Sequence, residues 1–90
     1  MPNSKTVRER VRGQLTDDKG KSYNVDLILT VQEMHVDEIE RPVARALARV
    51  ELAPRSGGDV PEGRYTLTFP FDGTQQRNNV RLESGTLLTG

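Results

Sequence analysis

The chain of 90 residues contains no cysteine and no tryptophan, and only 4% of its residues are aromatic. Without cysteine it cannot form disulfides, thiolate zinc sites, iron–sulfur clusters or a cysteine nucleophile. Small secreted domains usually carry disulfides, so their absence favours a reducing compartment. We therefore expect a cytoplasmic protein.

Long hydrophobic runs are also missing. The longest strongly apolar stretch is Leu27-Ile28-Leu29, whereas a membrane-spanning helix needs about 20 residues. The N-terminal stretch is charged and shows no signal peptide. We expect no membrane partner, and a single small β domain over residues 1–90.

The chain has no excess of either charge, because 13 basic and 13 acidic residues cancel. This removes the usual electrostatic reason to expect a general nucleic-acid binder. The charges are nevertheless unevenly distributed. Residues 1–22 carry six basic and three acidic groups, whereas residues 23–40 carry five carboxylates and no Lys or Arg. A basic segment next to an acidic one predicts ion pairs between them.

The first third of the chain alternates apolar and polar residues with a period of two, the pattern of half-buried strands. Segments 7–15 and 23–31 each place their odd-numbered, mostly apolar residues on one face. Between them, Asp18-Lys19-Gly20 fits a three-residue hairpin loop in which Gly20 takes the left-handed conformation. This loop predicts that the facing residues are Leu15 and Tyr23, Gly13 and Val25, Val11 and Leu27, Arg12 and Asp26, and Arg8 and Thr30.

The last third of the chain is expected to add further strands. Segment 63–71 alternates, and Pro70 within it indicates a sheet edge or a strand end, since proline donates no ladder hydrogen bond. Residues 72–79 are expected to form a polar loop. A further strand is expected over 80–88, with a bulge at Gly85.

Residues 36–52 fit two structures. Their apolar residues follow helical spacing, with Pro42 available for the first helical position, while the second half of the segment also alternates with a period of two. We favour a connecting loop over 35–42 and a strand over 45–52, because the neighbouring strands need partners. The alternative is a short helix within 37–50. The predicted fold is all-β, a small antiparallel barrel or sandwich of about five strands.

The most ordered polar feature is a stripe of three arginines, Arg8, Arg10 and Arg12, on one face of the first strand. Alternate residues of a strand lie about 6.6 Å apart, and such an array could bind phosphates or an acidic protein surface. These three residues are the candidate anion-binding site. Nucleic acid is not the favoured ligand, because Asp26 is expected beside Arg12 and all four aromatic residues fall on core faces. The alternative is a solvated sheet face that discourages edge aggregation.

Groups suited to catalysis are few. The single histidine, His35, has no cysteine or recognisable serine motif to activate. Continued strand geometry would place Glu33, His35 and Asp37 on one face, but metal sites usually have more nitrogen or sulfur ligands than this set offers. Asp37, Glu38 and Glu40 lack the glycine and the spaced Asp/Asn pattern of a calcium loop. We expect no enzyme, no metal site and no cofactor.

These observations favour a non-catalytic protein-interaction or assembly module, in which a strand edge or apolar patch binds a protein partner or a second copy. Ile28, Met34 and Leu47 are expected on the second face of the sheet, where another subunit could cover them. The alternative function is a small nucleic-acid- or anion-binding β-barrel that uses the arginine stripe.

Overall fold

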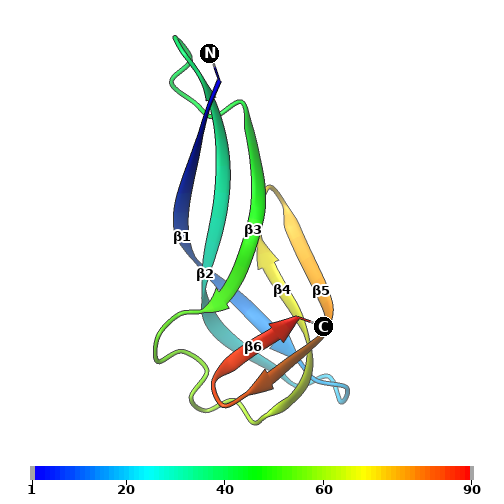
Figure 1. The fold of residues 1–90 in the computed structure, drawn as a ribbon. Coiled ribbons are helices and arrows are strands. Elements are labelled where there is room, and N and C mark those ends of the chain that lie inside the picture. The colour runs from blue at the N-terminus through cyan, green and yellow to red at the C-terminus, as the bar shows by residue number, and fades with distance from the viewer. Residues whose placement is uncertain (1, 90) are drawn as a thin grey trace.

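A computed structural model describes residues 2–89, and these form six antiparallel strands without a helix (Figure 1). The strands are β1 (Pro2–Thr16), β2 (Ser22–Val36), β3 (Ala44–Leu52), β4 (Gly63–Pro70), β5 (Thr74–Glu83) and β6 (Thr86–Thr89). They form one sheet in the order β3-β2-β1-β4-β5-β6. The sheet curls until β3 and β6, its two end strands, approach one another. The predicted small antiparallel all-β fold is confirmed: of the two alternatives, barrel and sandwich, the structure is a nearly closed barrel, and it has six strands where about five were predicted.

The first hairpin has the predicted turn and register. Gly20 has a φ of 85°, and the N–H of Asp17 donates to the carbonyl of Lys21 at 2.9 Å. The Asp17 carboxylate also accepts hydrogen bonds from the N–H groups of Lys19 (2.9 Å) and Lys21 (2.8 Å). The pairs Leu15–Tyr23, Gly13–Val25, Val11–Leu27, Arg12–Asp26 and Arg8–Thr30 all form.

The core is the inner face of the curled sheet, where the odd-numbered residues of the first hairpin meet β4 and β5. Tyr65 packs edge-to-face on Tyr23, with ring centroids 6.1 Å apart, and its hydroxyl donates to the carbonyl of Pro61 at 2.5 Å. No polar or charged residue is buried in the described part of the chain. The buried apolar residues are Leu15, Val25, Leu27, Leu29, Val31, Ala53, Tyr65, Leu67, Phe69, Val80 and Leu82.

The molecule is elongated. Its radius of gyration is 15.0 Å, compared with about 12 Å for a compact domain of this length. Figure 1 shows the reason: the upper parts of β1, β2 and β3 extend past the other strands as an arm. The arm ends in the β2–β3 turn, and its exposed apolar residues are Met34, near the end of β2, and Ile39 and Val43 in the turn. The described residues contain no helix that could span a membrane.

The polar loop predicted over 72–79 is wrong, because β5 begins at Thr74. Asp72 (φ 50°) and Gly73 (φ 107°) form a tight turn between β4 and β5. An Asp-Gly pair is a strong hairpin signal, which the polar composition of the segment concealed. The bulge predicted at Gly85 is also wrong, since Ser84 (φ 50°) and Gly85 (φ 77°) form the turn between β5 and β6. Pro70 ends β4, as predicted.

The helix considered within 37–50 does not form, and residues 44–52 are strand β3. The loop before it is shorter than predicted, because β2 continues to Val36. A β-bulge lies in the β2–β3 ladder: Thr30 pairs with Arg49, and Val31 pairs with Leu47. One extra residue in β3 shifts the alternation, so Leu47 packs against the core. The prediction that Leu47 lies on the second face is therefore wrong.

Candidate functional site

One edge of β1 is unpaired over most of its length. On one side, β1 pairs with β2 from Pro2 to Thr16, but on the other it pairs with β4 only from Gln14 to Thr16. The pairing stops there because β4 ends at Pro70, which has no N–H to donate. Among the strands that the structure describes, none pairs with residues 3–13 on this side. We call this stretch the free edge.

The even-numbered residues of the free edge present the unpaired backbone groups. In an antiparallel ladder, hydrogen-bonded and non-hydrogen-bonded pairs alternate. On β2, the carbonyls of Asp26 and Met34 accept hydrogen bonds from the β3 side, which leaves the odd-numbered residues of β2 to bond to β1. The odd residues of β1 pair with these odd residues. The N–H and C=O groups of residues 4, 6, 8, 10 and 12 therefore point away from β2.

Hydrogen exchange should reveal this geometry directly. We expect the amide protons of Val7, Glu9 and Val11 to exchange slowly, and those of Thr6, Arg8 and Arg10 to exchange at least about tenfold faster, because only the first set lies within a ladder. The measurement is residue-resolved amide exchange by NMR on the isolated protein. Equal protection of both sets would contradict a free edge.

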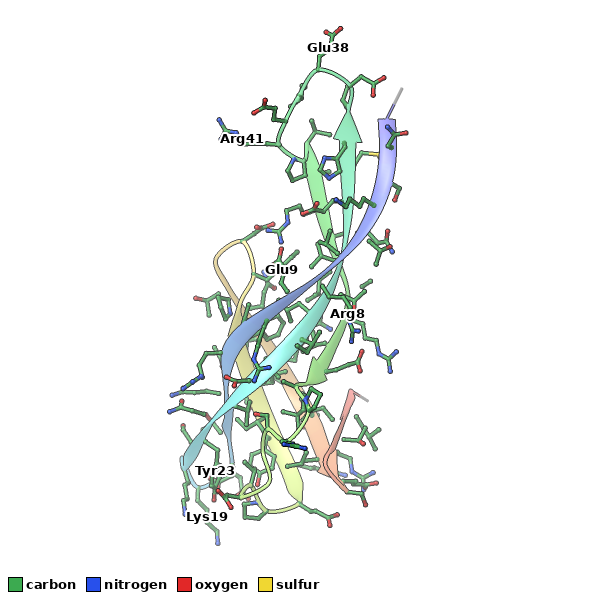
Figure 2. The ribbon with its side chains drawn as sticks, turned by 90° about the vertical axis from the view of Figure 1, so that its left-hand side faces the viewer. Arg8, Glu9, Lys19, Tyr23, Glu38 and Arg41 are labelled. Atoms are coloured by element: carbon green, nitrogen blue, oxygen red, sulfur yellow. The ribbon has the colours of Figure 1, made fainter. Side chains whose placement is uncertain are left out.

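The arginine stripe lies along this same edge, on the outer face of the sheet. Arg10 Nη2 donates to Asp26 Oδ2 at 2.9 Å, and Arg12 Nε donates to Asp26 Oδ1 at 3.0 Å. The predicted proximity of Arg12 and Asp26 is confirmed, and Arg10 joins the same carboxylate. The guanidinium of Arg8 forms no hydrogen bond or ion pair with the described residues and extends on the opposite side of β1 from Glu9 (Figure 2). Arg8 is thus the one member of the stripe without an ion pair among the described residues, and the other two share a single carboxylate.

These ion pairs affect the titration of Asp26. The hydrogen bond from Arg10, together with the charges of Arg12 and Arg10, outweighs partial burial and lowers the pKa of Asp26 below its ordinary value of 3.8. A carboxyl whose pKa is lowered by folding stabilises the folded state above its unfolded pKa, and this contribution disappears as the pH falls through the folded pKa.

We therefore expect Asp26→Asn to be less stable than the natural chain at pH 7. The difference should begin to shrink as the pH falls below about 4, where the carboxyl of the unfolded chain binds a proton while that of the folded protein stays ionised, and it should vanish once the folded carboxyl is protonated too. Urea unfolding at a series of pH values, followed by circular dichroism, measures this difference. A difference that stays constant down to pH 2 would contradict the assignment to this ion pair.

A second polar cluster lies on the inner face, where the arm joins the barrel. Arg45 donates a hydrogen bond to Glu9, and its Nη1 lies 3.3 Å from Asp72 Oδ1. Its Nε lies 3.4 Å from Glu33 Oε2, and its guanidinium stacks over the Phe71 ring at 5.2 Å. The hydrogen bond to Glu9 and the three nearby carboxylates raise the pKa of Arg45. Arg45 therefore links β3 to β1, to β2 and to the β4–β5 turn.

Removing the Arg45 charge should weaken this joint. We expect Arg45→Met to lower the melting temperature clearly more than Arg49→Met does, because it leaves three carboxylates facing one another without a cation. Arg49 is the matched control, since it lies on the same strand but is exposed, and its one ion pair with the described residues is to Glu51, at 3.2 Å. Thermal unfolding of both variants tests this, and equal shifts would contradict the role of Arg45.

The structure brings two of the three residues considered for a metal site together. His35 Nε2 lies 3.0 Å from Glu33 Oε1, whereas Asp37 lies in the turn after β2. Within residues 2–89, no three His, Asp or Glu side chains are arranged to hold a metal ion. Sequence reasoning missed the Arg45 cluster, although one signal was visible: Glu9 interrupts an otherwise apolar face.

The sheet has further edges without a ladder partner among the described strands, including the outer edges of β3 and β6 and residues 74–79 of β5. The outer edge of β3 borders a groove of about 450 Å³, closed on its far side by β6. The groove is lined by residues 48–52, Arg77 and residues 85–88. The free edge of β1, over residues 3–13, is the longest of these edges, and we therefore take it as the candidate for contact with another molecule. No family model, no curated protein and no solved structure matches this chain.

Proposed function

We propose that this protein is a non-catalytic interaction module that binds a protein partner by adding one of the partner's strands to the free edge of β1. The observation that carries the proposal is that residues 3–13 of β1 pair with β2 on one side but with no described strand on the other. An unpaired strand edge is a template for another extended chain, because its N–H and C=O groups match those of a second strand. Five even-numbered residues supply these groups here.

The shape of the molecule supports this proposal. The accessible surface is 6335 Å², about 1,000 Å² more than the roughly 5,300 Å² typical of a folded monomer of this mass. One partner in a standard protein–protein complex buries about 800 Å². The arm carries the part of the free edge that precedes Glu9, so this part extends past the other strands and is open to a partner (Figure 1).

Thr6→Pro tests the proposal, because it removes one edge N–H that has no partner within the protein. Proline is tolerated on an edge strand when its missing N–H would face solvent. Thr6→Val is the matched control, since it keeps the N–H and the β-branched shape. We expect both variants to fold. When immobilised, the natural chain and Thr6→Val should retain a partner from native extract, and Thr6→Pro should not retain it. Equal retention by all three would refute strand addition at this edge.

Anion binding by Arg8, Arg10 and Arg12 is the second candidate function. One observation favours it: Arg8, Thr30 and Arg49 form a single row across β1, β2 and β3, with one cation on each side of the Thr30 hydroxyl. Binding to oligonucleotides should then be strongest at low salt and should be lost in the triple alanine variant of the stripe. No binding at low salt would remove this function.

A further inference from the structure

We infer that the strand bound at the free edge carries acidic side chains at alternate positions, facing Arg8, Arg10 and Arg12, with apolar side chains between them. This inference rests on the function proposed above and identifies the chemistry of the partner. It follows from the charges on the two faces of the free edge and from the geometry of strand pairing.

The outer face sets the acidic positions. Residues directly opposite each other in paired strands point to the same face and lie close enough to interact. Side chains on one face of the partner strand repeat every ~6.6–6.8 Å, which equals the spacing of the arginines. Each arginine of the stripe can therefore face one carboxylate of the same extended segment, without distortion of either strand.

The charge balance of the outer face requires such carboxylates. The outer-face residues of the free edge include three arginines and no acid, and among the described residues Asp26 is the one carboxylate that pairs with them. Asp26 approaches from β2, on the side away from the free edge, and leaves Arg8 unpaired. The outer-face residues of the free edge are Ser4, Thr6, Arg8, Arg10 and Arg12.

The inner face sets the apolar positions. Val7 and Val11 point inward from the free edge and pack only partly against the core. Glu9, which lies between them, is engaged by Arg45 and is not available to a partner. Apolar side chains on the inner face of an added strand would cover the two valines, which completes an alternating acidic and apolar pattern.

The same stripe disfavours a second copy of this chain as the occupant. If two copies paired antiparallel through this edge, the outer faces of their sheets would be continuous. Each outer-face residue of one copy would then lie opposite an outer-face residue of the other. That set contains no carboxylate, so arginine would face arginine, serine or threonine in every register. Parallel in-register pairing places each arginine beside its own copy. Like charges in facing positions are destabilising, so the stripe selects against self-association.

A nucleic acid fits the free edge less well than a peptide. Phosphates could contact the arginines, but they cannot pair with the alternating N–H and C=O groups of a strand edge. Binding of single strands also relies on bases stacking upon exposed aromatic rings. Tyr65 and Phe69 are buried in the core, and Phe71 is covered by Arg45.

The test uses a fluorescein-labelled peptide of eight residues in which Glu and Val alternate. The matched control peptide has the same composition, with its four Glu in one block followed by four Val. We expect the alternating peptide to bind at low salt, at least about fivefold more tightly than the block peptide, because only the former places its charges at strand spacing. Fluorescence anisotropy measures both affinities, and equal binding would overturn the inference.

Two variants locate the binding. Arg8→Glu should weaken binding of the alternating peptide by about tenfold, because it replaces the unpaired cation with a like charge. Arg64→Glu is the matched control: it removes an exposed arginine that lies on β4, away from the free edge, and should leave binding unchanged. Equal weakening by both variants would show that the peptide responds to the net charge of the protein and not to the free edge, and it would overturn the inference.

The outcomes separate this inference from the proposed function. If the Thr6→Pro variant loses a natural partner but the natural chain does not bind the alternating peptide, strand addition stands and the acidic pattern is wrong. If the peptide binds equally well to Thr6→Pro, the backbone edge is not used and both proposals fall. Tighter binding of a single-stranded oligonucleotide than of the alternating peptide would also overturn the inference in favour of an anion surface.

Discussion

Phe69→Ala should lower the free energy of unfolding by about 3–5 kcal/mol, the range found for buried phenylalanines. Phe69 is 2% exposed and is the largest of the fully or nearly fully buried side chains. Typical domains are stable by about 5–15 kcal/mol, and this loss would take a large share of that margin.

Urea unfolding followed by far-ultraviolet circular dichroism measures this effect in a protein that has no tryptophan. Thr68→Ala is the control, because Thr68 neighbours Phe69 on β4 and points to the outer face, where substitutions usually change stability by less than about 0.5 kcal/mol. Similar losses for the two variants would show that Phe69 does not carry the core.

Gly13→Val should destabilise the protein by about 1–3 kcal/mol or more, although valine favours strands in general. A Cβ atom on Gly13 would lie 2.6 Å from Leu27 Cδ1 and 3.1 Å from the carbonyl oxygen of Thr68. The leucine end can move, but the carbonyl belongs to the backbone of β4. Thr68 is one of only three β4 residues that pair with β1, so a shift there opens the joint between the two halves of the sheet.

Gly58→Val is the matched control for this substitution, because nothing lies within 4 Å of a Cβ at that position. Unfolding curves of both variants should show a loss for Gly13→Val alone. Backbone amide spectra of Gly13→Val should also change at Leu15 and Leu67, which face each other across the β1–β4 ladder. A stable Gly13→Val variant with unchanged spectra would contradict the close approach at this position.

The elements that could be predicted from the sequence are those whose partners are close in the chain. The turn at 18–20 and the period-two pattern on both sides of it lead to the same register, and a slip of one residue would turn every apolar side chain towards water. The contact between Arg12 and Asp26 followed from that register alone. The Asp72-Gly73 turn was equally local, and it was missed because the polar residues that follow it form part of a strand.

The phase of β3 could not be predicted from alternation alone. A bulge opposite Thr30 and Val31 places Leu47 and Val50 on the same face, although they are three residues apart. Bulges depend on how a strand must bend to follow its neighbour, and this becomes apparent only when the sheet curls. The Arg45 cluster depends on the same feature, because it joins residues from three strands and a turn that are distant in the chain.

The sequence by itself determined the first hairpin, its register, the apolar inner face and the order of the arginine stripe, because turn chemistry and side-chain periodicity act over a few residues. The tertiary structure decided which strand edges are paired. The β1–β4 ladder connects residues at least 50 positions apart, and it ends where Pro70 removes a donor. That ending leaves the backbone beside Arg8, Arg10 and Arg12 without a partner, and the stripe thereby becomes part of a candidate binding edge.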